Sequence, residues 1–365
     1  FGAVGNGTTD DTAAIQAAID SLATTGGTVL LPPGNYKVTS TLYMRKGNVT
    51  LSGHGVSSLI TYTGTGSALY MGDSSSFIYN QVLDNFYIYC TNTTNALTEA
   101  IKVENAIHFI IRRVRLDGPY TPPATMYAYG LHIVNDSFAA TIDDLTAQLW
   151  KRGVYTQYRT AALSFSGKSG WLHNNMIAFE SGGVGDGGQD ANVSSIRDMV
   201  IEGNYAGGVL VNSASSFLID GVYFESNGYY DVKVGVAAGQ YPELVKIINS
   251  DMQSGDFPSN PYGANLYTKK IHVEYAHNTI IEGNNISMND TTPTIILDSG
   301  ADRTHVRNNR LNGTSTTLLR VTDNGTNSIF ENNNGYTPSI GSYTGTATGM
   351  TTSPTGSFKY TVANG

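Results

Sequence analysis

The chain alternates short apolar runs with polar turns, and one pattern recurs along most of its length. Each copy has an apolar residue, then a polar residue that is often Glu, then a turn rich in Gly or Asn. The clearest copies are Phe179-Glu180-Ser181-Gly182, Ile201-Glu202-Gly203-Asn204, Phe224-Glu225-Ser226-Asn227, Ile281-Glu282-Gly283-Asn284 and Phe330-Glu331-Asn332-Asn333. Weaker copies at Asn249 and Arg307 bring the repeat interval to roughly 22 to 33 residues.

Each repeat predicts three short strands, because one apolar stretch precedes the recurring pattern and another follows it. Three strands in a repeat of this length are typical of a parallel β-helix, in which each repeat forms one turn, or rung, of a solenoid. The predicted fold class is therefore all-β, a right-handed parallel β-helix. Strands of successive rungs lie about 4.8 Å apart, so equivalent residues of neighbouring repeats are expected to lie above one another.

The N-terminal end predicts an α-helix over about residues 10–23 that covers the open apolar end of the first rung. Its apolar positions follow helical spacing and are Ile15, Ala18, Ile19 and Leu22. Asp10 or Asp11 is the predicted N-cap. The β-helix with this cap is predicted to occupy residues 1–335. The Gly/Thr/Ser-rich segment 336–365 is predicted to form a C-terminal β cap or a subunit contact.

Composition narrows the class of protein. Charged residues make up 14% of the chain, Gly occurs 41 times and the formal net charge is −8. No Lys/Arg run is present, so a nucleic-acid partner is not expected. No apolar run is long enough to span a membrane, and Cys90 is the only cysteine, so neither an intrachain disulfide nor a multi-cysteine metal site is expected. We expect no cofactor and no metal.

The opening residues carry a resemblance to a known superfamily. The run from Phe1 to Ile19, FGAVGNGTTDDTAAIQAAI, and the run from Gly26 to Tyr36, GGTVLLPPGNY, resemble the start of the pectate-lyase-like right-handed β-helix superfamily. The segment 221–231, GVYFESNGYYD, is similar to stretches of bacteriophage tail spikes that degrade polysaccharides. The resemblance implies a polysaccharide partner, a homotrimer, and a location outside the cell or on the phage tail. Because the chain begins inside this motif, we also expect it to be trimmed at its N-terminus.

The candidate catalytic residues begin with three glutamates, Glu180, Glu202 and Glu225, at the same position of successive repeats. If the register holds, neighbouring carboxylates lie about 5 Å apart and the outer two about 10 Å apart. Like charges at this spacing raise one pKa, which gives the protonated acid and the ionised partner that glycoside hydrolysis needs. A plain turn role remains an alternative, because Glu282 and Glu331 share the pattern without acidic neighbours.

The glycine-rich segment 182–190 adds two further candidates. It replaces the strand that neighbouring repeats carry, and its glycines permit close approach of a ligand. Asp186 and Asp190 are expected beside Glu180, lining a groove. The alternative is a surface loop with two solvated carboxylates.

Side chains that could bind a sugar gather around the same repeats. Aromatic rings stack on sugar rings, and hydroxyl and ring N–H groups bond to sugar hydroxyls. The predicted substrate-binding residues are Trp150, Tyr155, Tyr158, His173, Tyr223, Tyr229 and Arg152. For each ring, a place in the core is the alternative.

The sequence thus predicts a polysaccharide depolymerase, most directly an endo-glycosidase with paired carboxylates on adjacent rungs. A uronate lyase on the same fold is one alternative. It needs a base and a cation that neutralises the substrate carboxylate, and Arg152, Tyr155 and His173 are candidates for these roles. A glycan-binding adhesin without catalysis is the other alternative.

Overall fold

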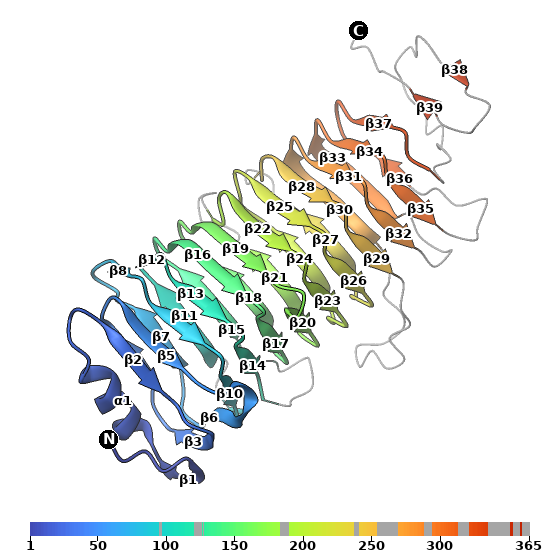
Figure 1. The fold of residues 1–365 in the computed structure, drawn as a ribbon. Coiled ribbons are helices and arrows are strands. Elements are labelled where there is room, and N and C mark those ends of the chain that lie inside the picture. The colour runs from blue at the N-terminus through green and yellow to red at the C-terminus, as the bar shows by residue number, and fades with distance from the viewer. Residues whose placement is uncertain are drawn as a thin grey trace.

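The computed structural model describes residues 1–94, 97–119, 126, 128–182, 190–236, 241–253, 269–287, 294–312 and 321–334, together with the backbone of 351–352 and 358–359. In these residues three long sheets run side by side from the N-terminal to the C-terminal end of the molecule (Figure 1). The predicted parallel β-helix is confirmed.

Each rung contributes one strand to each sheet, and neighbouring rungs pair in parallel. The 12-stranded sheet contains β1 (Asn6–Asp10), β3 (Gly34–Val38), β6 (Ser58–Tyr62), β10 (Tyr87–Cys90), β14 (Arg115–Asp117), β17 (Thr146–Gln148), β20 (Trp171–His173), β23 (Val200–Glu202), β26 (Tyr223–Glu225), β29 (Asp251–Gln253), β32 (Asn285–Ser287) and β35 (Arg310–Asn312). The 11-stranded sheet contains β4 (Leu42–Met44), β7 (Ser67–Gly72), β11 (Glu99–Glu104), β15 (Tyr129–Val134), β18 (Arg152–Thr156), β21 (Ile177–Ser181), β24 (Gly207–Val211), β27 (Tyr230–Val234), β30 (Lys269–His277), β33 (Ile295–Asp302) and β36 (Val321–Asp323).

The 14-stranded sheet completes each rung. It contains β2 (Gly27–Leu30), β5 (Val49–Ser52), β9 (Val82–Asp84), β13 (Ile110–Arg112), β16 (Phe138–Asp143), β19 (Ala161–Ser166), β22 (Ser194–Arg197), β25 (Phe217–Asp220), β28 (Val245–Ile248), β31 (Ile280–Glu282), β34 (His305–Arg307) and β37 (Ile329–Glu331), with β8 (Ile78–Tyr79) and β12 (Ala106–Ile107) beside this path. The chain therefore runs from the 14-stranded to the 12-stranded to the 11-stranded sheet and then begins the next rung.

Alternation along each short strand places one apolar residue inward and its neighbours outward. In β23, for example, Ile201 is fully buried while Val200 and Glu202 are half-buried. These inward residues form one continuous core along the solenoid. At the N-terminal end, α1 (Thr12–Asp20) buries Ile15 and Ile19 against this core, which confirms the predicted cap.

The N-cap of α1 is Asp11, but its side chain does not make the expected capping bond. Its carboxylate instead accepts hydrogen bonds from the backbone N–H groups of Val4 and Gly5, at 2.7 and 3.0 Å. Asp11 therefore ties the N-terminal segment to the start of the helix. At the other end, β38 (Thr351–Thr352) and β39 (Phe358–Lys359) pair antiparallel, and the role predicted for segment 336–365 stays a prediction.

Buried asparagine ladders stabilise two corners of the solenoid. Asn175, Asn204 and Asn227 lie at the corner between the 12-stranded and 11-stranded sheets, where Asn204 Nδ2 donates to Asn227 Oδ1 at 2.8 Å. Asn284 and Asn309 begin an equivalent ladder at the corner between the 14-stranded and 12-stranded sheets, with a bond of 3.0 Å. Each side chain satisfies backbone groups that a turn would otherwise leave unpaired.

Because both corners carry a buried asparagine, motifs that look alike in the sequence belong to different sheets. Ile201-Glu202-Gly203-Asn204 and Ile281-Glu282-Gly283-Asn284 read alike, but the first ends a strand of the 12-stranded sheet and the second a strand of the 14-stranded sheet. The predicted single column from Glu180 to Glu331 is therefore wrong. Its members are distributed over all three sheets.

Connections of very different length separate the sheets. Most junctions from the 14-stranded to the 12-stranded sheet are two-residue turns, such as Asp198-Met199. The longest connections border the 11-stranded sheet and cover residues 118–128, 182–193, 235–244 and 254–268, partly outside the described residues. Insertions on one side of a solenoid commonly mark its binding face.

Candidate functional site

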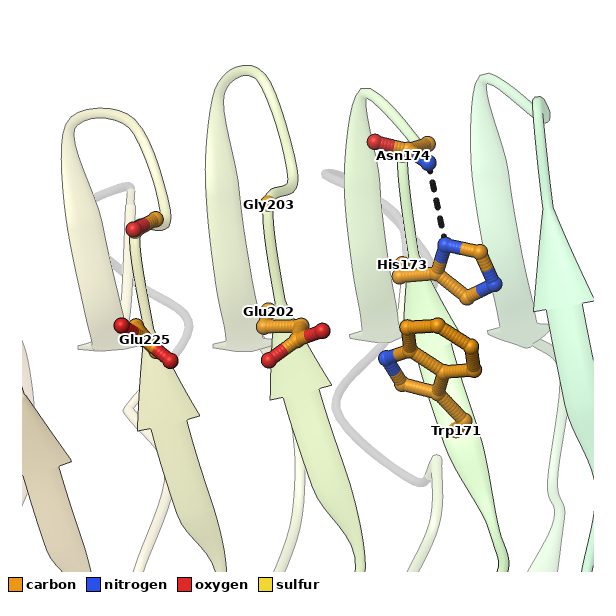
Figure 2. Close-up of a pocket in the computed structure, with 7 residues that line it drawn as sticks. Trp171, His173, Asn174, Glu202, Gly203 and Glu225 are labelled. Carbon is orange, nitrogen blue, oxygen red and sulfur yellow. Dashed lines mark hydrogen bonds between the residues drawn. The ribbon is translucent and has the colours of Figure 1, made fainter. Parts of the chain in front are cut away.

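Two carboxylates stand next to each other on the outer surface of the 12-stranded sheet. Strands β23 and β26 pair in parallel, and this register sets Glu202 directly opposite Glu225. Neighbouring strands are about 4.8 Å apart, so the carboxylates are separated by about the same distance at their bases. Figure 2 shows both side chains pointing outward from adjacent strands. The predicted pairing of Glu202 with Glu225 is confirmed.

The surroundings of Glu202 favour its protonated form. Burial raises the pKa of Glu202, the negative charge of Glu225 raises it further, and a hydrogen bond from Trp171 opposes the rise. Burial and a like charge both penalise a carboxylate relative to a carboxylic acid. Glu202 is therefore the member of the pair suited to donate a proton.

Glu225 is held by a neighbouring phenol. Tyr223, on the same strand, donates its hydroxyl to Glu225 Oε2 at 2.8 Å. Burial and this bond to a carboxylate raise the pKa of Tyr223 to about 12, so the hydroxyl keeps its proton and remains a donor. The predicted substrate-binding residue Tyr223 thus lies at the carboxylate pair and orients one member of it.

Two stacked rings on the preceding strand lie beside the carboxylate pair. Trp171 and His173 of β20 stack with ring centroids 3.6 Å apart, and 39% of Trp171 is exposed. Burial lowers the pKa of His173 to about 4, so the ring is neutral at neutral pH. Asn174 Nδ2 lies 3.0 Å from His173 Nδ1 (Figure 2); because an amide nitrogen donates, Nδ1 accepts and the ring proton sits on Nε2.

These side chains line one open hollow of about 290 Å³. Its walls are Trp171, His173, Asn174, Glu202, Gly203, Glu225 and Ser226. His173 occupies the position that sequence reasoning gave to Glu180, because β20 pairs with β23 and places His173 opposite Glu202. The hollow thus combines an aromatic wall, paired carboxylates and hydrogen-bonding groups, and the predicted sugar-binding role of this region stays a prediction.

The charge of this surface is mainly negative. Between β14 and β29, the charged side chains of the 12-stranded sheet are Arg115, Asp117, Glu202, Glu225 and Asp251. Its one cation, Arg115, is committed to Asp117 through an ion pair of 2.7 Å. The hollow therefore offers hydrogen-bond acceptors and an aromatic face, without a cation that would attract an acidic sugar.

Glu180 is not a member of this pair. It lies on β21 of the 11-stranded sheet, opposite Tyr155 of β18 and Leu210 of β24. It is 5% exposed and forms an ion pair with Arg152. The prediction of three stacked glutamates is wrong, because the Gly/Ser turn after Glu180 follows a strand of a different sheet from the turns after Glu202 and Glu225.

Glu180 instead belongs to a second polar cluster on the 11-stranded sheet. Arg152 lies over the ring of Tyr155 at 5.1 Å, and Tyr155 stacks on His132 at 5.4 Å. His132 Nδ1 is 2.7 Å from Glu99 Oε1, and the ring of Tyr129 is 4.4 Å from that of His132. Burial raises the pKa of Glu180, whereas the charge of Arg152 opposes that rise. Arg152 and Tyr155, both predicted to bind substrate, therefore meet here.

The other predicted site residues lie away from both clusters or in the interior. Trp150 is fully buried and its indole donates to Leu116 O at 3.1 Å, so it is a core residue and cannot stack on a sugar. Asp190 is also fully buried, with Oδ1 accepting from Arg159 N at 2.9 Å, so it does not line a groove. Tyr158 and Tyr229 are exposed at corners of the solenoid. Asp186 lies outside the described residues.

Sequence reasoning missed His132, Tyr129 and Glu99, and Trp171 is not among the predicted site residues. The signal for Trp171 was present in Trp171-Leu172-His173, where alternation around one buried Leu sends both rings to the same outer face. No comparable signal marked His132, because Leu131-His132-Ile133 shows only the apolar–polar–apolar alternation of an ordinary strand.

Among the described residues, no group of three or more His, Cys, Asp or Glu side chains is arranged to hold a metal ion. In the same part of the chain, no helix is long and apolar enough to cross a membrane.

Comparison with known proteins identifies a family and a fold for this chain. Residues 1–236 match the family described as rhamnogalacturonase A/epimerase, pectate lyase-like, and residues 129–351 match the right-handed β-helix region. The mannuronan C5-epimerase AlgE6 of Azotobacter vinelandii is 46% identical over 76 residues, which are 19% of this chain and 9% of that relative. The chain thus aligns with less than a tenth of that relative's length.

Solved structures share the fold over nearly the whole chain. The A-module of the same Azotobacter vinelandii epimerase has a TM-score of 0.68 and 22% identity, covering 93% of this chain and 95% of that one. An α-1,3-glucanase from Streptomyces thermodiastaticus has a TM-score of 0.59 and 15% identity, covering 92% and 68%. The tailspike of E. coli bacteriophage HK620 has a TM-score of 0.61 and 11% identity, covering 90% and 63%.

Proposed function

Because the chain belongs to the rhamnogalacturonase A/epimerase, pectate lyase-like family and contains a right-handed β-helix region, we propose that it acts on a polysaccharide as an endo-glycosidase. The observation that carries the proposal is the in-register pair of Glu202 and Glu225. Carboxylates about 5 Å apart suit a retaining mechanism, whereas an inverting mechanism needs about 6.5 to 9.5 Å.

In this mechanism Glu202 is the acid and Glu225 the nucleophile. Glu202 gives its proton to the glycosidic oxygen while Glu225 attacks the anomeric carbon, so the glycosidic bond breaks and a glycosyl ester forms. Glu202, now ionised, takes a proton from water, whose oxygen attacks the same carbon and releases Glu225. The raised pKa of Glu202 and the bond from Tyr223 to Glu225 support this assignment.

The charge of the hollow points to an uncharged sugar as its substrate. An acidic sugar would meet Glu202, Glu225 and Asp251 without a cation to balance its carboxylate, since Arg115 is paired with Asp117. Trp171 provides the exposed ring on which a sugar face stacks. We therefore expect neutral polysaccharides to be cleaved and polyuronates to be poor substrates at this site.

Product analysis tests the proposal. The protein is incubated with a panel of neutral polysaccharides and with a polyuronate, and new reducing ends and ultraviolet absorbance are both followed. New reducing ends without absorbance support hydrolysis, and retained configuration in the first product, read by NMR, supports the retaining pair. Binding without new ends, for every substrate, would instead identify a glycan-binding adhesin.

The cluster on the 11-stranded sheet favours a second candidate, a lyase or epimerase that removes the proton beside a uronate carboxyl group. Arg152 lies over Tyr155 and pairs with Glu180 through Nε, and a guanidinium has further N–H donors with which it can hold such a carboxylate. Tyr129 and His132, whose rings are 4.4 Å apart, supply groups that exchange protons. The long connections beside this sheet support it as a binding face.

The two candidates differ in product and in essential residue. A lyase gives an unsaturated product from a polyuronate, and an epimerase changes its sugar composition without breaking the chain. Either activity would be lost in Arg152→Lys, because the lysine ammonium is a point charge, whereas the planar guanidinium can bind a carboxylate through two hydrogen bonds. Glu202→Gln would leave it unchanged.

We also propose that the protein acts outside the cell or on a virion, as a homotrimer. The tailspike neighbour supports a place on a virion or outside the cell, where polysaccharides are met. The expected homotrimer is tested by the mass of the full chain in solution, measured by light scattering.

A further inference from the structure

A second hollow lies on a different sheet from the Glu202–Glu225 pair, near the C-terminal end of the 11-stranded sheet and one to three rungs beyond the rung of Glu225. Its volume is about 340 Å³, the size class of small-molecule sites. It is lined by Glu274, Tyr275, Asp298, Ser299, Gly300 and Asn324, which come from β30, β33 and the residue after β36. None of these residues takes part in either cluster described above.

The hollow is created by a β-bulge. Strands β30 and β33 pair in register up to Val273 and Leu297, and pairing resumes at Tyr275 and Gly300. Glu274 therefore faces two residues, Asp298 and Ser299, across the interruption. Bulges re-aim side chains and are enriched beside functional sites, and here all three residues of the bulge line the hollow.

Close packing of Gly300 fixes one wall. A Cβ at this position would lie 2.3 Å from Tyr275 Cδ1, so the ring of Tyr275 occupies the space that a side chain would need. The ring of Tyr241 packs against Tyr275 edge to face, with ring centroids 6.2 Å apart. The hollow thus has a positioned aromatic wall.

The two carboxylates of the hollow are fixed by partners on neighbouring residues. Glu274 forms an ion pair with Lys233 of β27. Asp298 Oδ2 lies 2.7 Å from His272 Nε2, and Lys269 Nζ lies 3.5 Å from His272 Nδ1. Burial lowers the pKa of His272, so its ring is neutral at neutral pH, accepts from Lys269 and donates to Asp298.

These contacts define what the hollow would recognise. A carboxylate has about four acceptor sites, so the bond to His272 leaves Asp298, which is 38% exposed, with acceptors for hydroxyl donors. Ser299 and the Asn324 amide add groups that both donate and accept. Lys233, the cation bonded to the wall, is paired with Glu274, and the described residues that line the hollow include two carboxylates and no Lys or Arg, which disfavours an anionic ligand.

We infer that the bulge hollow is a separate, non-catalytic binding site for a neutral sugar ring of a polysaccharide. The ring stacks on Tyr275 while its hydroxyls donate to Asp298 and Glu274 and exchange hydrogen bonds with Ser299 and Asn324. Because the hollow lies on a different sheet from Glu202 and Glu225, it holds the polymer without taking part in bond cleavage. The non-catalytic role rests on the proposed hydrolysis at Glu202 and Glu225, whereas the binding role rests on the lining of the hollow itself.

Affinity electrophoresis tests the site in the full chain. The double variant Glu202→Gln/Glu225→Gln, which protects the polymer from the proposed cleavage, is run in gels that contain mixed-linkage β-glucan, galactomannan or alginate. We expect retention by at least one neutral polymer and none by alginate. Adding Ser299→Trp fills the hollow from an exposed position, and we expect the affinity to fall at least about tenfold, a change of 1.4 kcal/mol.

Controls separate lost binding from lost structure. Ser74→Trp places the same ring on an exposed turn near the other end of the solenoid and should leave retention unchanged. Asp298→Asn, a change of one atom, should weaken retention while the melting temperature stays near that of the parent. Equal retention of the Ser299→Trp variant and its parent, or no retention in any neutral gel, would overturn the inference. Stabilisation by calcium that Asp298→Asn abolishes, without glycan retention, would show a cation site instead.

Discussion

Glu202 and Glu225 share one hollow because β23 and β26 pair in register, which sets the two carboxylates opposite each other on the outer face of the 12-stranded sheet. The same register puts His173 next to Glu202 on the other side and Gln253 next to Glu225. The acidic pair is therefore bounded by neutral polar residues along the axis of the solenoid. In this column, a substrate aligned with the axis meets the pair of carboxylates and then His173 on one side or Gln253 on the other.

Replacing either carboxylate should abolish hydrolysis without loss of the fold. We expect Glu202→Gln and Glu225→Gln each to lower kcat/KM by at least about a hundredfold, the usual contribution of an acid catalyst or more. Both side chains are only half-buried, so the melting temperature should change little. Reducing-end assays and thermal melts on the same preparations check this.

Glu282→Gln is the matched control. Glu282 belongs to an almost identical motif, Ile-Glu-Gly-Asn, but lies on the 14-stranded sheet in an ion pair with Arg307. Its substitution should leave kcat/KM within about twofold, as for a surface residue. A loss as large as that of Glu202→Gln would show that the motif matters for folding and not for chemistry.

The pH dependence of activity should follow Glu202. Hydrolysis needs Glu202 protonated, so kcat/KM should decline as pH rises through its pKa, which burial and Glu225 raise above the ordinary Glu value. The bond from Trp171 opposes that rise, so Trp171→Phe should move the alkaline limb to higher pH. A limb that stays in place, or moves to lower pH, would argue against Glu202 as the acid.

Arg152 should be essential for stability, whichever reaction occurs. Its removal leaves the carboxylate of Glu180, 5% exposed, without its partner, and breaking a buried ion pair costs about 3 to 5 kcal/mol. We expect Arg152→Met to lower the free energy of unfolding by about this amount at pH 7. Urea unfolding followed by circular dichroism measures it.

Lowering the pH should reduce the loss of unfolding free energy caused by Arg152→Met. Burial already raises the pKa of Glu180, and losing Arg152 removes the charge that opposed the rise. For a group whose folded pKa exceeds its unfolded pKa, stability falls as pH rises between the two values. Arg152→Met should therefore be less destabilising at pH 5 than at pH 7, and Arg152→Met/Glu180→Gln should be nearly insensitive to pH in this window. A penalty that is the same at both values would contradict the account.

The rungs were predictable from the sequence because alternation and turn residues are local signals. The predicted three short strands per repeat are present, for example as β22, β23 and β24 of one rung. The helix over Thr12–Asp20 followed from the spacing of Ile15 and Ile19.

The sheet to which each strand belongs was harder to predict from the sequence, because it depends on which corner of the rung the following turn occupies. Ser181-Gly182 and Gly203-Asn204 both end a strand with a small residue, but one leaves the 11-stranded and the other the 12-stranded sheet. Each rung has three corners, and the local sequence at two of them is nearly the same. The predicted pairing of Glu202 with Glu225 is correct because their rungs follow each other with no insertion. The prediction for Glu180 is wrong because it assigned this residue to the 12-stranded sheet, whereas Glu180 lies on the 11-stranded sheet.

Asn204 should contribute more to stability than any exposed asparagine. It is 1% exposed, accepts from the Asn175 backbone N–H at 3.0 Å and donates both to Leu172 O and to Asn227 Oδ1. Asn204→Ala leaves these buried groups without partners. One such unpaired group costs about 1 to 3 kcal/mol, so the free energy of unfolding should fall by at least that amount. Asn285→Ala removes a half-buried surface amide that bonds Asp251 and should cost about 0.5 kcal/mol or less. Equal losses in the two variants, measured by urea unfolding, would mean that the ladder follows from the rungs and does not stabilise them.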